Sequence, residues 1–379
     1  MQGSKRVLSY VLGFAVGLLA VAPPLNYAIP VVVNSYWWLY GCVVAGFLGM
    51  YLLMTDLPLS LKILSAYLFV GCFLSMAPYV SFNAAILAIA ALYCFIGFTK
   101  SDYKIITDIV TAAFLLQLIF VVFQLCTMDK LMNFDRQEPV VFGTVMQNMR
   151  FGSLIAIMTP LIVYKNKWFI IPIIAMAFLS ESASFGLAIA AGMTVYFVLK
   201  YPKRGLIVAS LGAVGAIVYC LFDFTSVSVA FTCGRIPVWG AIIRTWVMDT
   251  SHQFVLPLTG PVDWKSIFIG RGLDTFLPLF PIFKHDLNPF GQAHNCHLQF
   301  LWEIGLVGYG LLVAYFINLV RRVWSQPLLV AGLVCMSVNM FFAFPTRETQ
   351  TMLMMICFIA LCEQTARLID DKGVEYARH

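Results

Sequence analysis

The chain has 379 residues, of which 61% are hydrophobic and 11% are charged. A soluble domain carries about 25% charged residues, so this composition excludes an ordinary soluble protein and predicts a helical membrane protein. The apolar runs are continuous rather than alternating, which argues against a transmembrane β-barrel. The net charge of +6 is spread along the chain, so it indicates membrane orientation and no nucleic-acid partner.

The apolar runs predict an all-α polytopic membrane protein, with residues 1–379 forming a single integral membrane domain. Several runs are shorter than the ~20 residues that cross a bilayer, so tilted or broken spans are expected. At residues 180–184 a plain hairpin and a re-entrant break are both open. The expected transmembrane helices, about twelve, are residues 7–22, 37–54, 63–77, 83–98, 105–126, 150–164, 168–180, 184–199, 205–222, 303–320, 326–344 and 350–366.

Lysine and arginine set the expected orientation. With the N-terminus inside, short inner segments hold most of the basic residues, as the positive-inside rule requires. The first apolar run then acts as an uncleaved anchor rather than a signal peptide. Two long loops, about 127–149 and 223–302, face the outside. The inner basic residues are Lys5, Arg6, Lys62, Lys100, Lys104, Lys165, Lys167, Lys200, Lys203, Arg204, Arg321, Arg322, Arg367, Lys372 and Arg378.

The outer loop at 223–302 is too long for a simple connector. Its tryptophans and branched apolar residues argue against disorder, so we expect a packed helical loop. Residues 234–246 predict an amphipathic helix with Pro237 in the first turn. Arg235 and Trp239 lie four positions apart and can share a face of that helix.

Further along this loop, Arg271 stands between Gly270 and Gly272. Two flanking glycines allow the backbone to approach a ligand closely. A simple turn is the equally open alternative.

Polar residues gather where the loop re-enters the membrane, and polar groups near a bilayer mark function. A helix starting near position 294 would place His294, His297, Leu301, Gly305 and Gly308 in one stripe. No carboxylate or thiol cluster completes a metal site around the two histidines, so no metal is expected. The polar residues of this segment are His294, Asn295, His297, Gln299 and Glu303.

Three blocks of the chain resemble the membrane O-antigen ligase and O-antigen polymerase family, and together they cover about residues 140–310. The most specific is His294-Asn295-Cys296-His297-Leu298-Gln299, which is similar to the family's His-Asn-x-x-Leu-Gln block. The other two blocks are Gly143-Thr144-Val145-Met146-Gln147-Asn148 and the pair Gly234-Arg235-Ile236-Pro237-Val238-Trp239 and Ile269-Gly270-Arg271-Gly272.

The resemblance implies a glycosyltransferase of the bacterial inner membrane, with its active site facing the periplasm. The implied donor is a glycan on undecaprenyl pyrophosphate, and no cofactor is implied. The implied acceptor is lipid A core in a ligase, or a second polyprenyl-linked glycan in a polymerase. Carried over by position, Arg235 would hold the pyrophosphate and His294 would lie at the reacting centre.

The chain departs from the family where a Ser-Arg pair is usual, since it has Ser182-Ala183-Ser184 there. A second arginine for the pyrophosphate is therefore missing, and Arg150, Arg271 and Arg347 are open alternatives for that role. We expect sugar hydroxyls to contact Asn295, His297 and Gln299. The remaining expected substrate-binding residues are Gln147, Asn148 and Trp239.

Alternatives to ligation of O-antigen onto lipid A core are open. O-antigen or exopolysaccharide polymerisation differs only in the acceptor. A polysaccharide transporter or flippase would suit broken spans, but the chain shows no repeated halves. A disulfide between Cys233 and Cys296 would join the Arg235 and His294 segments in an oxidising compartment, and two cysteines that are not bonded to each other are the alternative.

Overall fold

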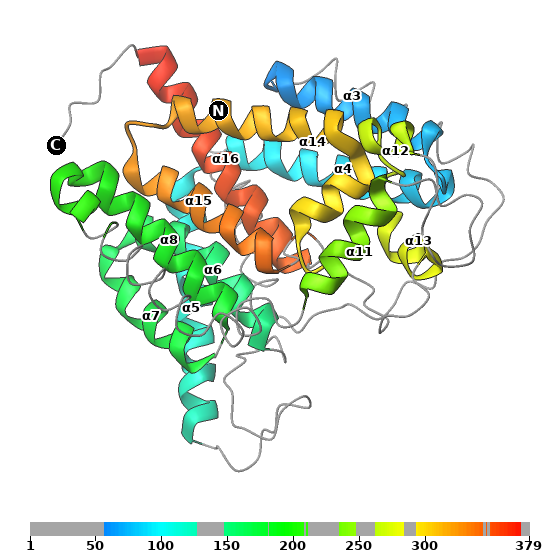
Figure 1. Cartoon of the computed structure of the whole chain (residues 1–379). Coiled ribbons are helices and arrows are strands. Elements are labelled where there is room, and N and C mark those ends of the chain that lie inside the picture. The colour runs from blue at the N-terminus through cyan, green and yellow to red at the C-terminus, as the bar shows by residue number, and fades with distance from the viewer. Residues whose placement is uncertain are drawn as a thin grey trace. The chain divides into compact units, whose positions relative to one another are not determined.

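The computed structural model describes residues 57–126, 148–180, 182–207, 210, 235–247, 262–283, 293–343, 346 and 349–372 (Figure 1). Regular structure in these ranges is helical, and no strand occurs in them, which confirms the predicted all-α class. The expected spans 7–22 and 37–54, and most of 205–222, lie outside the described residues.

Nine of the twelve expected spans fall on helices of the structure. Among the described residues, four helices are long and apolar enough to cross a membrane, namely α4, α5, α14 and α16, and four shorter apolar helices accompany them. The described helices are α3 (Leu59–Leu74), α4 (Pro78–Thr99), α5 (Tyr103–Cys126), α6 (Asn148–Lys165), η1 (Lys167–Phe169), α7 (Ile170–Leu179), α8 (Ala183–Lys200), α11 (Ile236–Val247), α12 (Trp264–Phe268), α13 (Phe276–Phe283), α14 (Cys296–Arg322), α15 (Pro327–Phe342) and α16 (Thr349–Lys372).

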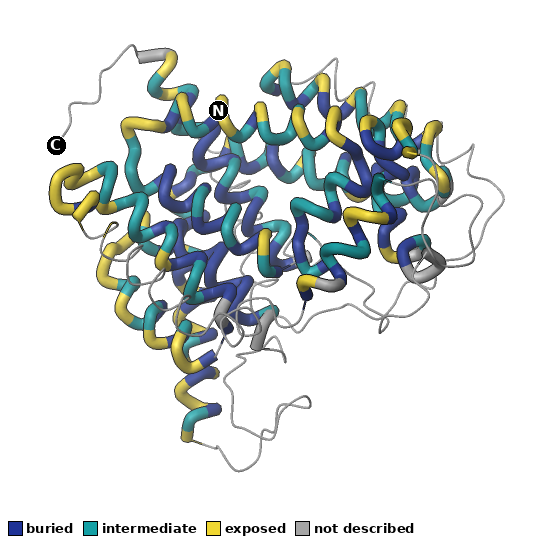
Figure 2. The backbone as a smooth tube through the Cα atoms, in the orientation of Figure 1, coloured by how far each residue is buried: buried dark blue, intermediate teal, exposed yellow. Residues whose placement is uncertain are grey.

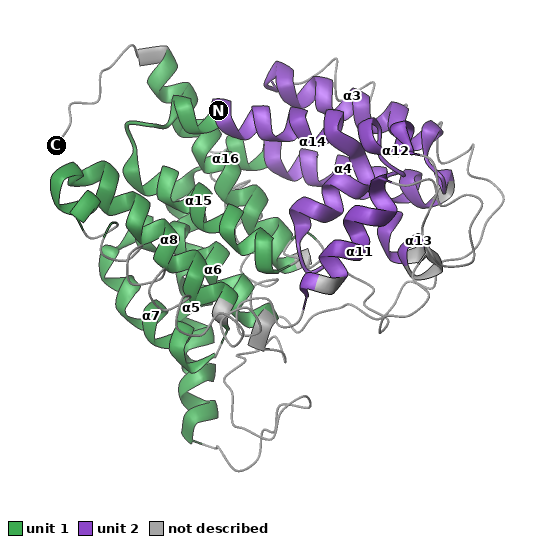
Figure 3. Ribbon diagram, in the orientation of Figure 1, with its two compact units in different colours: residues 1–28, 97–233, 319–379 green, residues 29–96, 234–318 purple. Residues whose placement is uncertain are grey.

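The chain divides into two compact units, which Figure 3 colours separately. Unit 1 consists of residues 1–28, 97–233 and 319–379, and unit 2 consists of residues 29–96 and 234–318. Each unit is therefore built from segments that are far apart in the sequence.

In unit 1, α6 is the central helix and contacts α5, α7, α8, α15 and α16. Its residues 151–162 are buried without interruption, as the dark stretch of tube in Figure 2 shows. A helix that is apolar on all sides is expected at the centre of a bundle. The stretch has two polar side chains, and both are hydrogen-bonded. Ser153 donates to the Asn339 side chain of α15 at 2.7 Å, and Thr159 donates to the Ile155 carbonyl at 2.7 Å.

The break between α7 and α8 is short, with Ser180 and Ser182 buried on either side of it. The Ser182 and Ser184 hydroxyls lie 3.1 Å apart and share a hydrogen bond. With only ten residues, α7 is about 15 Å long, half of a bilayer core. Of the two alternatives open at residues 180–184, a plain hairpin and a re-entrant break, this short helix favours the break.

In unit 2, α11 confirms the helix that residues 234–246 predict, with Pro237 in its first turn. One face of α11 packs Val238 and Ile242 against α13 and α14. Phe276 stacks on Phe280 at 4.5 Å and meets Trp302 edge-on at 5.3 Å. The buried core of this cluster is Val238, Ile242, Phe276, Phe280, Ala293 and Trp302.

The continuous histidine–glycine stripe expected from position 294 is wrong in two places. Helix α14 begins at Cys296, so His294 precedes it and adopts a positive φ of 50°. The helix is then broken at Gly305, where φ is 65° and ψ is −177°. Sequence spacing alone assumes an unbroken helical period, and this backbone interrupts that period.

A loop of unit 2 fills the break in α14. The backbone N–H of Arg271 donates to the Trp302 carbonyl at 3.1 Å, and that of Gly272 donates to the Glu303 carbonyl at 2.9 Å. The Tyr67 hydroxyl donates to the Ile304 carbonyl at 2.9 Å. Buried carbonyls that lose their helical partners need such replacements, so the loop and Tyr67 of α3 complete the hydrogen bonding of the broken helix.

Candidate functional site

The two residues predicted to be catalytic lie in unit 2, where α11 and the start of α14 meet. His294 sits in the segment that leads into α14, and Arg235 immediately precedes α11. They are 59 positions apart in the chain, yet they are close enough that the charge of Arg235 acts on His294. The structure therefore brings together the two residues predicted to be catalytic.

Two hydrogen bonds fix the backbone on either side of His294. The Trp239 indole N–H donates to the Ala293 carbonyl at 3.1 Å, which ties α11 to this segment. Asn295 accepts from the Leu298 backbone N–H at 3.0 Å through its side-chain oxygen, in the manner of an N-cap. Asn295 thus starts α14, and Trp239 positions the chain just before it.

His294 has left-handed backbone geometry, with φ at 50°. That region costs a residue with a side chain about 1 kcal/mol or more, although histidine enters it more readily than most. Strained backbone clusters at functional sites, where the surroundings hold it in place. Here the contacts of Trp239 and Asn295 hold it.

Electrostatics keep the His294 imidazole neutral. Burial lowers its pKa, the positive Arg235 lowers it further, and the result is a pKa of about 4. Both effects disfavour a second positive charge in this place. At neutral pH, His294 can therefore accept a proton beside a buried guanidinium, since Arg235 is only 5% exposed.

His297, the other histidine of the block, is half-buried and has a different partner. Its Nδ1 lies 2.9 Å from the Tyr309 hydroxyl, and the two rings meet edge-on. The two residues are twelve positions apart, whereas side chains that meet on one helix are three or four positions apart. Sequence spacing therefore could not have identified Tyr309 as the partner of His297.

Gln299 is engaged inside the protein. Its Nε2 donates to Glu303 at 2.9 Å, one helical turn later. Glu303 also accepts from the backbone N–H groups of Asp274 and Phe276, and Phe276 is the first residue of α13. These hydrogen bonds satisfy backbone N–H groups at the start of α13 from a side chain of α14, so this pair anchors α13 to α14.

Arg271 is almost fully buried, at 1% exposed. Its guanidinium donates to the Thr245 carbonyl at 2.5 Å and lies 3.5 Å from the Asp263 carboxylate. It also stacks over Trp302 at 5.5 Å. These contacts join α11, α12 and α14, and they favour a structural role for Arg271 over the ligand contact that remains the alternative.

The other predicted site residues are placed as follows. Arg150 lies in α6 of unit 1 and is half-buried. Asn148 is the first residue of the same helix, and only its backbone is described. Gln147, Arg347 and Cys233 lie outside the described residues. Cys296 is buried, and because Cys233 lies outside the described residues, both alternatives for these two cysteines stay open.

In the described part of the chain, no group of three or more His, Cys, Asp or Glu side chains is arranged to hold a metal ion. Comparison with known proteins found no matching family model and no matching curated protein. The described residues place a neutral imidazole, His294, within the electrostatic influence of a buried guanidinium, Arg235.

Proposed function

We propose that this chain is a membrane glycosyltransferase that moves a glycan from a polyprenyl pyrophosphate to an acceptor hydroxyl. The single observation that carries the proposal is the Arg235–His294 pair, a buried cation next to an imidazole whose pKa is lowered to about 4. The two halves of the proposed reaction need these two kinds of group, an anion ligand and a neutral base.

The proposed reaction is a displacement at the anomeric carbon. The acceptor oxygen bonds to that carbon, its proton moves to His294, and the bond from the carbon to the pyrophosphate breaks. Arg235 stabilises the negative charge that develops on the leaving pyrophosphate. Attack from the face opposite the leaving group inverts the anomeric centre.

The full proposal places about twelve spans in a bacterial inner membrane, with loop 223–302 on the periplasmic side. Support comes from the apolar helices that are long enough to span a bilayer and from the resemblance of the His294–Gln299 block to the O-antigen ligase family. Undecaprenyl pyrophosphate is the proposed carrier and lipid A core the proposed acceptor, and polymerisation of O-antigen or exopolysaccharide is the alternative within this class.

The test is complementation of a strain that lacks its O-antigen ligase, read out on lipopolysaccharide gels. We expect ladders with the wild-type chain and none with His294→Ala or Arg235→Ala, because each variant removes one half of the mechanism. Arg244→Ala is the matched control, since Arg244 is an exposed arginine of α11, the helix that Arg235 precedes. Each variant must accumulate in membranes to the wild-type level.

Near-normal ladders with either His294→Ala or Arg235→Ala would contradict the proposal. If the chain restored ladders in a polymerase-deficient strain but not in the ligase-deficient strain, the function would be polymerisation instead of ligation. In the same assay, Arg150→Ala and Arg347→Ala test which arginine serves as the second pyrophosphate ligand.

A transporter or flippase is the second candidate, and the break in α14 at Gly305 favours it. In transporters, the backbone freed at such breaks binds substrate or ions. Here the carbonyls of Trp302, Glu303 and Ile304 already accept protein donors, which leaves the break closed by the protein itself. Reconstituted vesicles that flip a polyprenyl-linked glycan without transferring it would support this second candidate.

A further inference from the structure

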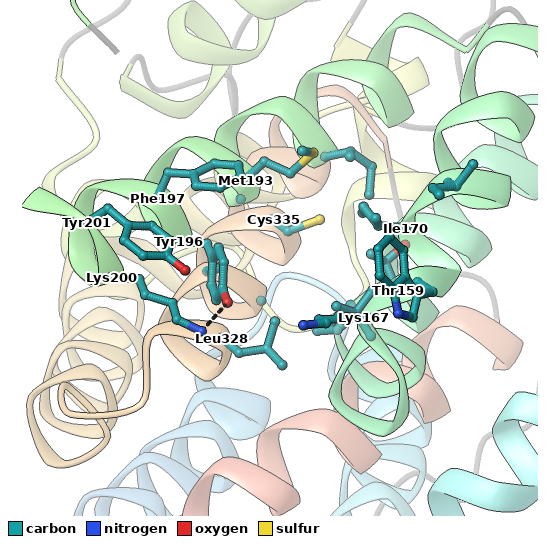
Figure 4. A pocket seen from close by; sticks show the side chains of 18 residues that line it. Thr159, Lys167, Ile170, Met193, Tyr196, Phe197, Lys200, Tyr201, Leu328 and Cys335 are labelled. Atoms are coloured by element: carbon teal, nitrogen blue, oxygen red, sulfur yellow. Dashed lines mark hydrogen bonds between the residues drawn. The ribbon is translucent and has the colours of Figure 1, made fainter. Parts of the chain in front are cut away.

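Unit 1 contains a groove that the proposed reaction does not use. It is walled by α6, η1, α7, α8 and α15 and has a volume of about 430 Å³, within the range of about 300–1,000 Å³ typical of ligand sites. Figure 4 shows its side chains converging from these helices.

The walls of the groove are apolar. Gly192 of α8 forms part of the lining, and a side chain there would press on the Ala331 carbonyl and on Cys335, so α8 and α15 pack closely. At the rim, Trp168 is 67% exposed and Ile171 is 60% exposed. In a protein whose helices are long and apolar enough to cross a membrane, such exposed apolar side chains are expected to face lipid.

One end of the groove is positively charged. Lys167 and Lys200 line it, and Figure 4 shows their ammonium groups at the same end, on either side of Leu328. Lys200 donates to the Tyr196 hydroxyl at 2.9 Å and lies 5.8 Å from the Tyr201 ring. The groove thus pairs hydrophobic walls with a cationic, hydroxyl-bearing end.

No acidic side chain lines this groove. Within the described residues, Lys167 and Lys200 form no ion pair, whereas the neighbouring Lys165 pairs with Asp108. Two positive charges are therefore available to an anion. Both lysines also belong to segments that the positive-inside rule assigns to the inner face, where anionic lipids attract basic groups.

We propose that this groove binds an anionic phospholipid of the inner leaflet. The phosphate lies between Lys167 and Lys200, with the Tyr196 hydroxyl within the same cluster, and an acyl chain lies along the apolar walls. A zwitterionic lipid would bring a cation toward two lysines, so the charge selects against it. This site is separate from the Arg235–His294 pair and does not depend on the proposed function.

The test is lipid retention by the full purified chain, measured by native mass spectrometry after exchange into equal phosphatidylglycerol and phosphatidylcholine. We expect wild type to retain phosphatidylglycerol preferentially. Each lysine near a lipid surface contributes about fivefold, so Lys167→Gln with Lys200→Gln should lower the preference about 25-fold. The control is Lys62→Gln with Lys104→Gln, which removes equal charge from outside the groove.

A second variant tests the acyl part of the site. Val163→Trp fills the groove and keeps both lysines, so it should lose retention of phosphatidylglycerol while its melting temperature stays near that of the wild type. Wild-type retention by this variant would overturn the placement of the lipid.

Three further results would overturn the proposal. They are equal retention of both lipids by the wild type, an unchanged preference in the double lysine variant, and a preference that falls as much in the control pair. Adding inorganic phosphate alone tests whether the acyl chains contribute to binding. If it raises the melting temperature as much as phosphatidylglycerol does, the site binds phosphate and not a lipid.

Discussion

At the scale of single residues, the protonation state of His294 is set by its surroundings. An ordinary histidine titrates near pH 6.5, but burial and Arg235 lower the His294 pKa to about 4. The imidazole is therefore neutral across the physiological range. An unprotonated ring can receive a proton, and it carries no permanent positive charge.

The lowered pKa predicts how the protein responds to acid. Between about pH 6.5 and pH 4 the unfolded chain binds a proton at this imidazole and the folded chain does not, so the folded state loses stability as the pH falls through that window. The acidic limb of the transfer rate should lie near pH 4, where His294 becomes protonated.

Two measurements check this expectation. One is the pH profile of glycan transfer, and the other is the carbethoxylation of His294 by diethyl pyrocarbonate, followed by mass spectrometry, which needs neutral imidazole and no substrate. A limb near pH 6.5 in both would mean that Arg235 and burial do not act on His294 as the structure indicates.

At the scale of elements, the break in α14 is expected to be highly sensitive to mutation. A Cβ at Gly305 would overlap the Phe268 carbonyl and the Gly270 nitrogen, and its φ of 65° disfavours any side chain. We expect Gly305→Ala to destabilise the protein by at least about 1–2 kcal/mol, which lowers the melting temperature in detergent.

Gly310 is the matched control in the same helix, because a Cβ there would meet no atom within 4 Å. Alanine is favoured over glycine in a helix by about 1 kcal/mol, so Gly310→Ala should leave the melting temperature equal or higher. If the two variants melted alike, the break at Gly305 would not be a feature of the folded protein.

At the scale of the whole molecule, ion pairs join chain-distant helices within unit 1. Arg322, at the end of α14, donates to Glu363 at 2.8 Å and to Asp370 at 2.7 Å. Glu363 is 1% exposed. A buried carboxylate that loses its cation is strongly destabilised, so this contact secures the last turns of α16.

Arg322→Met should therefore destabilise the protein by about 3 kcal/mol, the lower end of the range for breaking a buried pair, because Arg367 remains 3.6 Å from Glu363. Arg321→Met is the control, since Arg321 is the exposed neighbour. Denaturation in detergent compares the two variants, and equal losses would show that Arg322 contributes only surface charge.

The sequence by itself determined the helical class, the nine apolar segments that the structure shows as helices, and the α11 helix, since apolar runs and turn chemistry are local properties. It also selected His294 and Arg235 through a resemblance. The tertiary structure alone decided that these residues meet, that α14 breaks at Gly305, and that Arg271 and Gln299 are held by protein partners. Those outcomes depend on contacts between residues far apart in the chain, which no local period or composition encodes.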